Sequence, residues 1–330
     1  MYETAFHNEP INDKTFLVTG GAGFIGSNLV EYLLKHGAKK VRVLDNLLTS
    51  KIDNIKPFLS HPDFEFIEGD IRDLEACRRA CEKIQYVSHQ AALGSVPRSV
   101  NDPLTSHEIN STGFVNMLVA ARYEKVSRFV YASSSSVYGD HPILPKKEDE
   151  LGNLLSPYAV TKRTNELYAA VFSATYKMKI IGLRYFNVFG PKQSPEGPYA
   201  AVIPLFIQSV LKNQSPSIDG DGEQTRDFTF VENAVMANVK AMLTKNEAAQ
   251  NKVYNVALGN RISINELFRL ISEQAGANIK PIHRETRAGD IRDSLADISS
   301  ARSLLGYEPE VQIKEGLDQT LNWFRQNMQS

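Results

Sequence analysis

A glycine-rich segment near the N terminus constrains the fold of this chain more than any other feature. It reads Thr-Gly-Gly-Ala-Gly-Phe-Ile-Gly over residues 19–26, between an apolar strand-like run and a helix-like run. Gly20, Gly23 and Gly26 recur with the spacing Gly-x-x-Gly-x-x-Gly, a variant of the dinucleotide-binding fingerprint. Glycines let the backbone approach a pyrophosphate closely, and the N–H groups at the start of the helix then point toward it. The segment therefore predicts a strand-turn-helix unit that binds a dinucleotide.

Short apolar runs alternate with helix-like stretches in the first half of the sequence. This alternation predicts an α/β fold with a Rossmann-type, doubly wound parallel sheet. We expect strands at residues 15–19, 41–45, 64–68, 86–89, 129–132 and 180–185, and helices at 25–36, 74–83, 103–124 and 157–176. The chain becomes rich in Pro and Gly after Gly190. We therefore expect an NAD-binding domain over 1–190 and a smaller C-terminal α/β substrate-binding lobe over 191–330, with some later segments returning to the first domain.

The charge balance excludes several classes of protein. Lys and Arg total 37 against 38 Asp and Glu, so the formal net charge of −1 argues against binding to nucleic acid or to an anionic membrane. The chain has no apolar run long enough to span a membrane and no signal-like start, so we expect a cytoplasmic protein. Its two cysteines, Cys77 and Cys81, are too few ligands for a metal site, and we expect no metal.

Acidic residues after the second and third predicted strands bear on the choice of cofactor. Asp45 ends the second strand, where a carboxylate would bond ribose hydroxyls and repel a 2′-phosphate, so NAD is favoured over NADP. Asp70 and Ile71 follow the third strand and are candidates for contact with the adenine edge. The alternative for Asp70 is that it caps the helix that begins near Asp73.

Tyr158 and Lys162 are candidates for hydride chemistry on an alcohol. They lie four residues apart in a predicted helix and therefore share one face of it. A phenol with an unperturbed pKa of about 10 is a poor base at neutral pH, but a nearby ammonium favours its ionised form. The run of serines from Ser133 to Ser136 precedes the pair. The alternative is a surface tyrosine beside a solvated lysine.

Taken in order along the chain, these motifs resemble the extended short-chain dehydrogenase/reductases, and specifically the nucleotide-sugar 4-epimerases. Further matching segments are Asp45-Asn46, Gln90-Ala91-Ala92, 110–113, 133–138, 184–187, Thr225-Arg226-Asp227 and Arg287-x-Gly289-Asp290. Segments 92–99, 138–142, 155–162 and 199–204 resemble the bacterial UDP-N-acetylglucosamine 4-epimerases.

The resemblance implies a role for each catalytic residue. Tyr158 is the expected base, Lys162 lowers the pKa of Tyr158 and binds the nicotinamide ribose, and Ser134 hydrogen-bonds the reacting hydroxyl. Four consecutive serines leave this last assignment open by one position, and Ser135 and Ser136 would face the sugar. The implied cofactor-binding residues are Gly20, Gly23, Phe24, Ile25, Gly26, Asp45, Asn46, Thr49, Asp70, Ile71, Gln90, Ala91, Ala92, Asn110, Tyr158, Lys162 and Tyr185.

The resemblance also implies how a UDP-sugar is held. Arg226 and Arg287 match diphosphate-binding arginines, although either arginine is also a candidate for a surface ion pair. Ser294 is small, which leaves room for a 2-acetamido group unless its size reflects packing alone. The other expected substrate-binding residues are Gly94, Ser95, Ser135, Ser136, Asn187, Ala201, Val202 and Asp290.

The expected activity is the interconversion of UDP-N-acetylglucosamine and UDP-N-acetylgalactosamine through a 4-keto intermediate, with tightly bound NAD. Related dehydratases carry Asp-Glu where this chain has Ser135 and Ser136, so the keto intermediate can only be reduced again. One alternative is an epimerase of UDP-N-acetylglucosaminuronate or UDP-glucuronate, for which Arg98, Arg284 or Arg292 would have to meet the carboxylate. A remote alternative is a non-catalytic NAD-sensing protein. The family also implies a homodimer through helices 103–124 and 157–176, although packing on the sheet explains their apolar stripe equally well.

Overall fold

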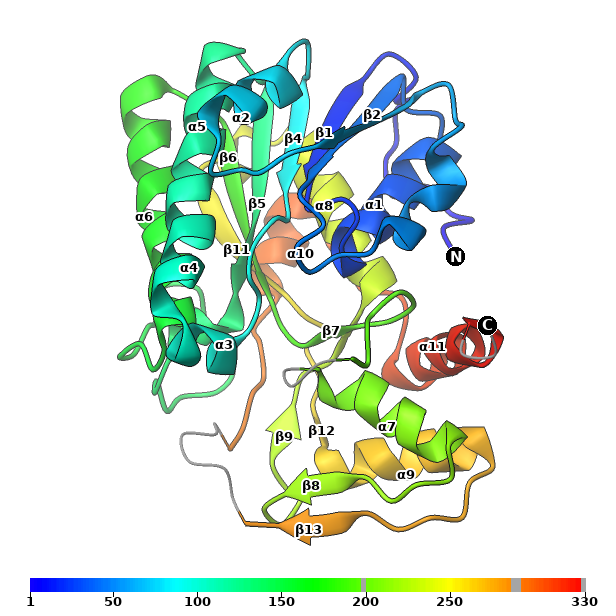
Figure 1. Ribbon diagram of the computed structural model, residues 1–330. Helices are drawn as coiled ribbons and strands as arrows, with labels where there is room; N and C mark the ends of the chain where they lie inside the picture. Colours follow the sequence, from blue (N-terminus) through cyan, green and yellow to red (C-terminus); the bar gives the residue numbers. More distant parts are fainter. Residues whose placement is uncertain (197–199, 286–291, 328–330) are drawn as a thin grey trace.

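A seven-stranded parallel sheet forms the framework of the larger part of the molecule in the computed structural model, which describes residues 1–196, 200–285 and 292–327. Its strands are β1 (Thr15–Thr19), β2 (Lys40–Asp45), β3 (Phe64–Glu68), β4 (Tyr86–His89), β5 (Arg128–Ser134), β6 (Ile180–Tyr185) and β11 (Lys252–Val256). Their order is β11-β6-β5-β4-β1-β2-β3 (Figure 1). The predicted doubly wound α/β fold is confirmed. The order reverses between β1 and β4, which is where ligands bind in such sheets.

Both faces of the sheet are buried, which explains the nearly continuous apolar strands. Phe16 and Val18 of β1 pack in one core cluster, whereas Leu17 between them packs in another. Helices α1 (Phe24–Lys35) and α8 (Val231–Leu243) cover the first face (Figure 1). Helices α2 (Leu74–Cys81), α5 (Gly113–Tyr123) and α6 (Pro157–Tyr176) cover the second. Because β11 and α8 come from beyond residue 190, later segments of the chain return to this part.

A smaller lobe lies below the sheet in Figure 1 and has a core of its own, rich in Phe. Its strands pair two by two as β10-β7, β12-β9 and β13-β8. The elements of this lobe are β7 (Val188–Phe189), α7 (Val202–Leu211), β8 (Ser217–Asp219), β9 (Thr225–Arg226), β10 (Thr229–Phe230), β12 (Ile262–Ser263), α9 (Ile264–Ala275), β13 (Ile282–Arg284) and α11 (Ile313–Asn327). Helix α10 (Ser299–Leu305) packs against β11.

Two stretches differ from the sequence-based prediction. The single helix predicted over 103–124 consists of α4 (Pro103–His107), a π-helical segment (Glu108–Thr112) and α5. Asn110 lies in the π-helical segment, and its side chain bonds the backbone N–H and carbonyl of Leu93 instead of facing solvent. Strand β5 continues past residue 132 to Ser134, and residues Ser135–Tyr138 form a 3-10 turn. An additional short helix, α3 (Val96–Asn101), was not predicted.

Helix α6 places the candidate catalytic pair. The Ser156 hydroxyl accepts a hydrogen bond from the Ala159 N–H, and Pro157 occupies the first turn, so both residues favour a helix start here. The helix ends where Lys177 adopts a left-handed conformation with a φ of 57°. Tyr158 therefore lies in the first turn and Lys162 one turn later.

In the part of the chain that the structure describes, no helix combines the length and the apolar composition that a bilayer crossing requires. Among the same residues, no three His, Cys, Asp or Glu side chains lie close enough together to hold a metal ion.

Candidate active site

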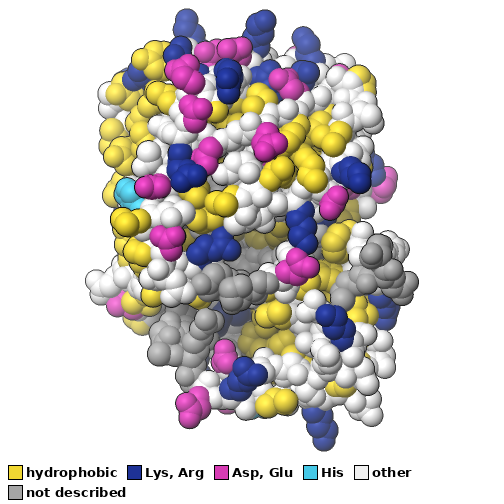
Figure 2. Space-filling view, in the orientation of Figure 1, with side chains coloured by type: hydrophobic (Ala, Val, Ile, Leu, Met, Phe, Trp, Pro, Cys, Tyr) yellow, Lys and Arg dark blue, Asp and Glu magenta, His cyan; other side chains and the backbone are white. Residues whose placement is uncertain are grey.

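Two adjoining cavities lie where the sheet meets the smaller lobe, and Figure 2 shows the surface hollowed at this junction. The first cavity, of about 580 Å³, runs along the carboxyl ends of the strands. The second cavity, of about 380 Å³, extends toward the smaller lobe. Both volumes fall within the range typical of small-molecule sites. Ser134, Ser135, Tyr158 and Asn187 line both cavities, so these four residues mark the junction.

The glycine loop forms one wall of the first cavity and leaves no space for a side chain at Gly20 or Gly26. Gly20 has a φ of 65°, and a Cβ atom added to it would lie 2.7 Å from the backbone nitrogen of Ala91. A Cβ atom on Gly26 would lie 2.2 Å from the Gly20 carbonyl oxygen. Helix α1 begins here with neither a side-chain cap nor an acidic residue in its first turn. Its N–H groups are therefore available to an anion, which fits a dinucleotide pyrophosphate.

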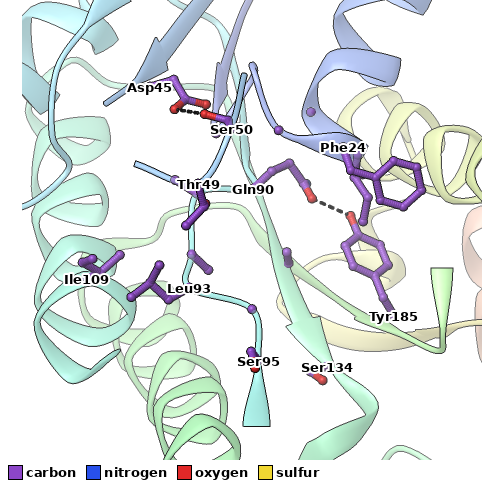
Figure 3. Close-up of a pocket in the computed structure, with 18 of the residues that line it drawn as sticks. Phe24, Asp45, Thr49, Ser50, Gln90, Leu93, Ser95, Ile109, Ser134 and Tyr185 are labelled. Atoms are coloured by element: carbon purple, nitrogen blue, oxygen red, sulfur yellow. Dashed lines mark hydrogen bonds between the residues drawn. The ribbon is translucent and has the colours of Figure 1, made fainter. Parts of the chain in front are cut away.

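Asp45 lies at one end of the first cavity, and Ser95 and Ser134 lie at the other (Figure 3). One carboxylate oxygen of Asp45 accepts hydrogen bonds from Ser50 Oγ (2.6 Å) and the Leu47 N–H (2.9 Å). The other accepts from the Ala22 N–H of the glycine loop at 3.0 Å. These bonds hold the carboxylate in place and leave it acceptor capacity for ribose hydroxyls. Ser50 was not predicted, since no motif marks it.

Most of the predicted cofactor-binding residues lie together on the first cavity. Those lining it are Gly20, Gly23, Phe24, Ile25, Gly26, Asp45, Asn46, Thr49, Ile71, Gln90, Ala91, Ala92, Tyr158, Lys162 and Tyr185. The predicted substrate residues Gly94 and Ser95 line it as well. Figure 3 shows Phe24 and Tyr185 along one side and Leu93 and Ile109 along the other.

The predicted cofactor-binding residues Asp70 and Asn110 do not line this cavity. The Asp70 carboxylate accepts hydrogen bonds from the side chains of Arg72 and Asn46, and the Arg72 contact lowers the pKa of Asp70 to about 2. Asn110 is buried, and besides its bonds to Leu93 it donates to Thr161 Oγ1 at 3.2 Å. Both side chains therefore fix neighbouring segments of the wall.

Tyr158 and Lys162 lie close together, as their spacing predicted, but the pKa of Tyr158 is raised and not lowered. The Lys162 ammonium lies 5.8 Å from the centroid of the Tyr158 ring and donates a hydrogen bond to the Ala132 carbonyl at 2.8 Å. Burial raises the pKa of Tyr158, against the opposing effect of a hydrogen bond with Ser134. Burial also lowers the pKa of Lys162 to about 8, while the Glu166 carboxylate opposes this shift. In the protein alone, desolvation thus raises the pKa of the phenol, whereas the pattern predicted that Lys162 would lower it.

The four serines have different surroundings. Ser133 is buried, and its hydroxyl donates to Glu166 Oε1 at 2.7 Å. Ser134 lines both cavities, hydrogen-bonds with Tyr158, and accepts a bond from the Ser136 N–H at 3.2 Å. Ser135 lines both cavities, and Ser136 lines the second with a buried hydroxyl that has no partner in the described part of the chain. This arrangement favours Ser134 as the serine that works with Tyr158.

A buried ion pair supports this region from behind and was not predicted. The Glu166 carboxylate accepts from Arg184 Nε at 2.8 Å and from a second Arg184 nitrogen at 2.9 Å. Ser133 donates to the same carboxylate, and Glu166 lies one helical turn after Lys162. The spacing Lys-x-x-x-Glu on α6 is visible in the sequence, but nothing local identifies Arg184 as its partner.

The second cavity holds part of the predicted substrate set. Arg226 and Ser294 line it, together with Ser136, Asn187 and an unpredicted lysine, Lys146. Ala201 and Val202 lie at the start of α7 and line neither cavity. Arg287 and Asp290 lie outside the described residues. Arg226 donates to the carbonyls of Thr225 (2.9 Å) and Arg292 (3.1 Å), which orient its guanidinium.

Comparisons with known proteins identify a family for this arrangement. Residues 16–257 match the NAD dependent epimerase/dehydratase family. The chain is 40% identical over 313 residues to a putative UDP-glucose 4-epimerase of Methanocaldococcus jannaschii, covering 94% of this chain and 98% of that protein. It also matches the UDP-N-acetylglucosamine 4-epimerase of Methanobrevibacter ruminantium M1, solved with UDP-N-acetylmuramic acid, with a TM-score of 0.90 and 39% identity over 96% of this chain and 99% of that one.

A third match is the UDP-glucuronic acid 4-epimerase of Bacillus cereus, solved with UDP-glucuronic acid and NAD. Its TM-score is 0.88 at 32% identity, covering 94% of this chain and 99% of that one. The resemblance to extended short-chain dehydrogenase/reductases is thereby confirmed. The glycine loop, the Tyr158 and Lys162 pair and these matches agree, and the chain belongs to the NAD dependent epimerase/dehydratase family.

Proposed function

We propose that this chain is a UDP-sugar 4-epimerase that interconverts UDP-N-acetylglucosamine and UDP-N-acetylgalactosamine. The observation that carries the proposal is the junction of the two cavities at Ser134 and Tyr158. A dinucleotide in the first cavity and a sugar in the second would meet at these two side chains. Bound NAD supplies a hydride acceptor for the sugar C4 and a positive ring charge that favours a phenolate.

Tyr158 is the general base in this proposal. Its phenolate oxygen takes the proton from the sugar 4-hydroxyl, and Ser134 positions that hydroxyl by a hydrogen bond. Lys162 keeps a positive charge beneath the Tyr158 ring, where it offsets the cost of ionising a buried phenol. After the sugar has turned over, C4 would take the hydride back on its opposite face and Tyr158 would return the proton to the C4 oxygen, so configuration at C4 is inverted without a net change of the cofactor.

Arg226 anchors the diphosphate while the sugar turns. Its guanidinium lines the second cavity at the smaller lobe, away from the glycine loop. Anchoring at the non-reacting end lets the reacting end rotate without leaving the site. Ser135 and Ser136 offer hydroxyls to the sugar but no carboxylate, so the site has no acid at those positions to eliminate water from a keto intermediate.

The acetamido preference rests on Ser294, which lines the second cavity. A small side chain there leaves space for the 2-acetamido group. Ser294→Tyr should fill that space, so turnover of UDP-N-acetylglucosamine should fall far more than turnover of UDP-glucose. Equal losses on the two sugars would remove Ser294 from sugar selection. Ser299→Tyr, at the exposed first position of α10, controls for the added ring.

A second candidate substrate is a UDP-hexuronic acid, and Lys146 is the observation that favours it. Lys146 is 5% exposed, lines the second cavity and donates to the His141 carbonyl. Burial lowers its pKa, and the negative charge of Asp140 opposes this. The arginines expected to meet a carboxylate, Arg98, Arg284 and Arg292, line neither cavity. An ammonium partly withdrawn from water is stabilised by a carboxylate partner, which a uronic acid would bring.

One assay separates these possibilities. Purified protein is incubated, without added cofactor, with UDP-glucose, UDP-N-acetylglucosamine, UDP-glucuronate or UDP-N-acetylglucosaminuronate, and the C4 epimers are separated by chromatography. Preferred turnover of UDP-N-acetylglucosamine supports the main proposal. Preferred turnover of a uronate that Lys146→Met abolishes supports the second. Absence of epimers from all four sugars would contradict both and favour an NAD-sensing role.

We also propose that the protein forms a homodimer through α4 and α6. Val160, Leu167 and Val171 lie along one face of α6 and are 49%, 53% and 57% exposed. Leu104 of the neighbouring α4 is 77% exposed. Apolar side chains gathered on one face in this way suit a self-complementary interface. Sedimentation velocity should give a dimer that Leu167→Glu weakens, and a monomeric wild-type protein at all concentrations would contradict the proposal.

A further inference from the structure

Asp227 carries a buried carboxylate for which the proposed chemistry has no use. It follows Arg226 directly, and its exposed fraction is 0%. Burial raises the pKa of Asp227 to about 7, although the backbone N–H groups that it accepts from oppose this shift. A buried charge costs free energy unless hydrogen bonds compensate it. The contacts of Asp227 therefore indicate what the residue does.

The carboxylate of Asp227 joins segments that are far apart in the sequence. Its Oδ1 accepts from the Leu258 N–H at 3.0 Å. Its Oδ2 accepts from the N–H groups of Gly259 and Ala296, both at 3.2 Å. Leu258 and Gly259 follow the edge strand β11 of the large sheet, whereas Ala296 precedes helix α10. One side chain thus fixes the loop between β9 and β10 to both.

Two of these segments, the loop between β9 and β10 and the stretch that precedes α10, reach the second cavity. Ser294 lies two residues before Ala296, and its N–H donates to the Thr225 carbonyl at 3.1 Å. Asn187, between β6 and β7, donates its Nδ2 to the backbone carbonyl of Asp227 at 3.0 Å. Arg226, Asn187 and Ser294 all line the second cavity. No single element of secondary structure carries two of these three residues, so the distances between them depend on hydrogen bonds between separate segments.

We propose that Asp227 is a positioning residue for the UDP-sugar: its buried carboxylate fixes the segments that carry Arg226 and Ser294, and its backbone carbonyl ties Asn187 to them, without touching the substrate. This inference rests on the proposed function, in which those three residues bind the nucleotide-sugar. Asp227→Asn keeps the shape of the side chain but replaces one acceptor oxygen with an NH2 group. That group would face a backbone N–H donor, so at least one of the three hydrogen bonds is lost.

Helix α8 offers a matched control. Asn233 is also 0% exposed and also holds a distant backbone segment. Its Oδ1 accepts from the N–H groups of Glu310 (3.1 Å) and Val311 (3.2 Å), and its Nδ2 donates to the Val311 carbonyl at 2.8 Å. Residues 310 and 311 line neither cavity. Asn233→Ala therefore removes a comparable set of contacts away from the proposed substrate site.

The test compares the two variants by UDP affinity in isothermal titration calorimetry, by KM and kcat, by the amount of NAD that co-purifies, and by thermal unfolding. Asp227→Asn should raise the UDP Kd and the KM about tenfold or more, as expected for a lost bond to a charged group. Its kcat and its NAD content should stay close to wild type. Asn233→Ala should lower the unfolding temperature as much but leave the UDP Kd unchanged.

Two outcomes would overturn the inference. UDP binding by Asp227→Asn at wild-type strength would show that the carboxylate does not position the anchor. Equal weakening of UDP binding by both variants would show that loss of stability alone explains the effect. Failure of the wild-type protein to bind UDP would instead refute the proposed function, and the inference with it.

A measurement on the wild-type protein covers the case in which Asp227→Asn does not fold. Coupling between two sites is reciprocal, so saturating UDP should slow hydrogen exchange at the amides of Leu258, Gly259 and Ala296. The amides of Glu310 and Val311, held by Asn233, should not change. Unchanged exchange at the three Asp227-bound amides in the presence of bound UDP would contradict the inference.

Discussion

The two cavities of the site are built in different ways. Short consecutive segments at the carboxyl ends of neighbouring strands line most of the first cavity, namely 20–26, 44–50, 69–71, 90–95 and 132–135. The second cavity gathers side chains from distant places, including Lys146, Tyr158, Arg226 and Ser294. The first therefore depends on local backbone shape and the second on contacts between segments. Substitutions in the first cavity should therefore impair NAD binding, and substitutions in the second should impair binding of the UDP-sugar.

The largest effect should come from Tyr158→Phe, because Tyr158 belongs to both cavities. Losing the base should lower kcat by about 10²–10⁴-fold, as for other general acid–base groups. NAD content and UDP affinity should stay near wild type, because the ring remains. Steady-state kinetics and calorimetry check this expectation. A variant with near-normal kcat would show that Tyr158 is not the base.

Gly26→Ala should damage the first cavity alone. Its new Cβ atom would lie 2.2 Å from the Gly20 carbonyl oxygen, so the loop must move. Overpacking of this kind costs about 1–3 kcal/mol, which corresponds to roughly five- to 150-fold weaker NAD binding if the strain falls on the loop. NAD released from denatured protein measures the loss. Gly23→Ala, with a contact of 3.1 Å to the same oxygen, should lose less NAD. The opposite order would contradict the steric explanation.

Arg226→Gln should damage the second cavity alone. Removing a cation from a diphosphate site costs about 1.5–3 kcal/mol, so the KM for the UDP-sugar should rise roughly ten- to 100-fold. NAD content and the unfolding temperature should change little, since the first cavity does not include Arg226. Kinetics on UDP-sugar, with bound NAD measured in the same samples, test the separation. Loss of NAD in this variant would mean that the two cavities are not independent.

The smallest effect should appear in the pH dependence of kcat. Burial lowers the pKa of Lys162 to about 8, so its ammonium loses its proton as the pH rises through that value. The neutral amine no longer stabilises ionised Tyr158, so kcat should decline above pH 8.

The pH dependence of the unfolding free energy has the opposite sign. In the unfolded chain Lys162 has the unperturbed lysine pKa of about 10.4. The unfolded chain therefore holds more protons than the folded one between about pH 8 and 10.4, so the unfolding free energy should rise with pH in that window.

Lys162→Met provides the control for both pH effects. It should remove the decline of kcat above pH 8 and flatten the rise in unfolding free energy. A wild-type kcat that stays constant from pH 7 to 10 would indicate that Lys162 remains charged or does not act on Tyr158. Denaturant unfolding at several pH values measures the second effect.

Local patterns predicted the first cavity well, for a physical reason. Gly20, Gly23 and Gly26 suit the loop because its backbone packs closely against neighbouring backbone atoms. Asp45 lies in the same cavity because the carboxyl ends of parallel strands meet at one edge of the sheet. The spacing of Tyr158 and Lys162 follows from helix geometry. The same patterns do not reveal the effect of burial on the pKa of Tyr158, because desolvation depends on atoms from several elements. The roles of the individual residues in both cavities stay predictions.

By itself, the amino-acid sequence determined the strand-helix alternation, the glycine loop and the Tyr158 and Lys162 spacing, because each of these depends on residues within a turn or two of one another. Only the tertiary structure distinguished Ser133, bound to Glu166, from Ser134 at the cavity junction. It also brought Lys146 into the second cavity and Asp227 against Leu258 and Ala296. Such contacts join residues tens of positions apart, and no local periodicity encodes which distant backbone N–H a buried carboxylate will meet.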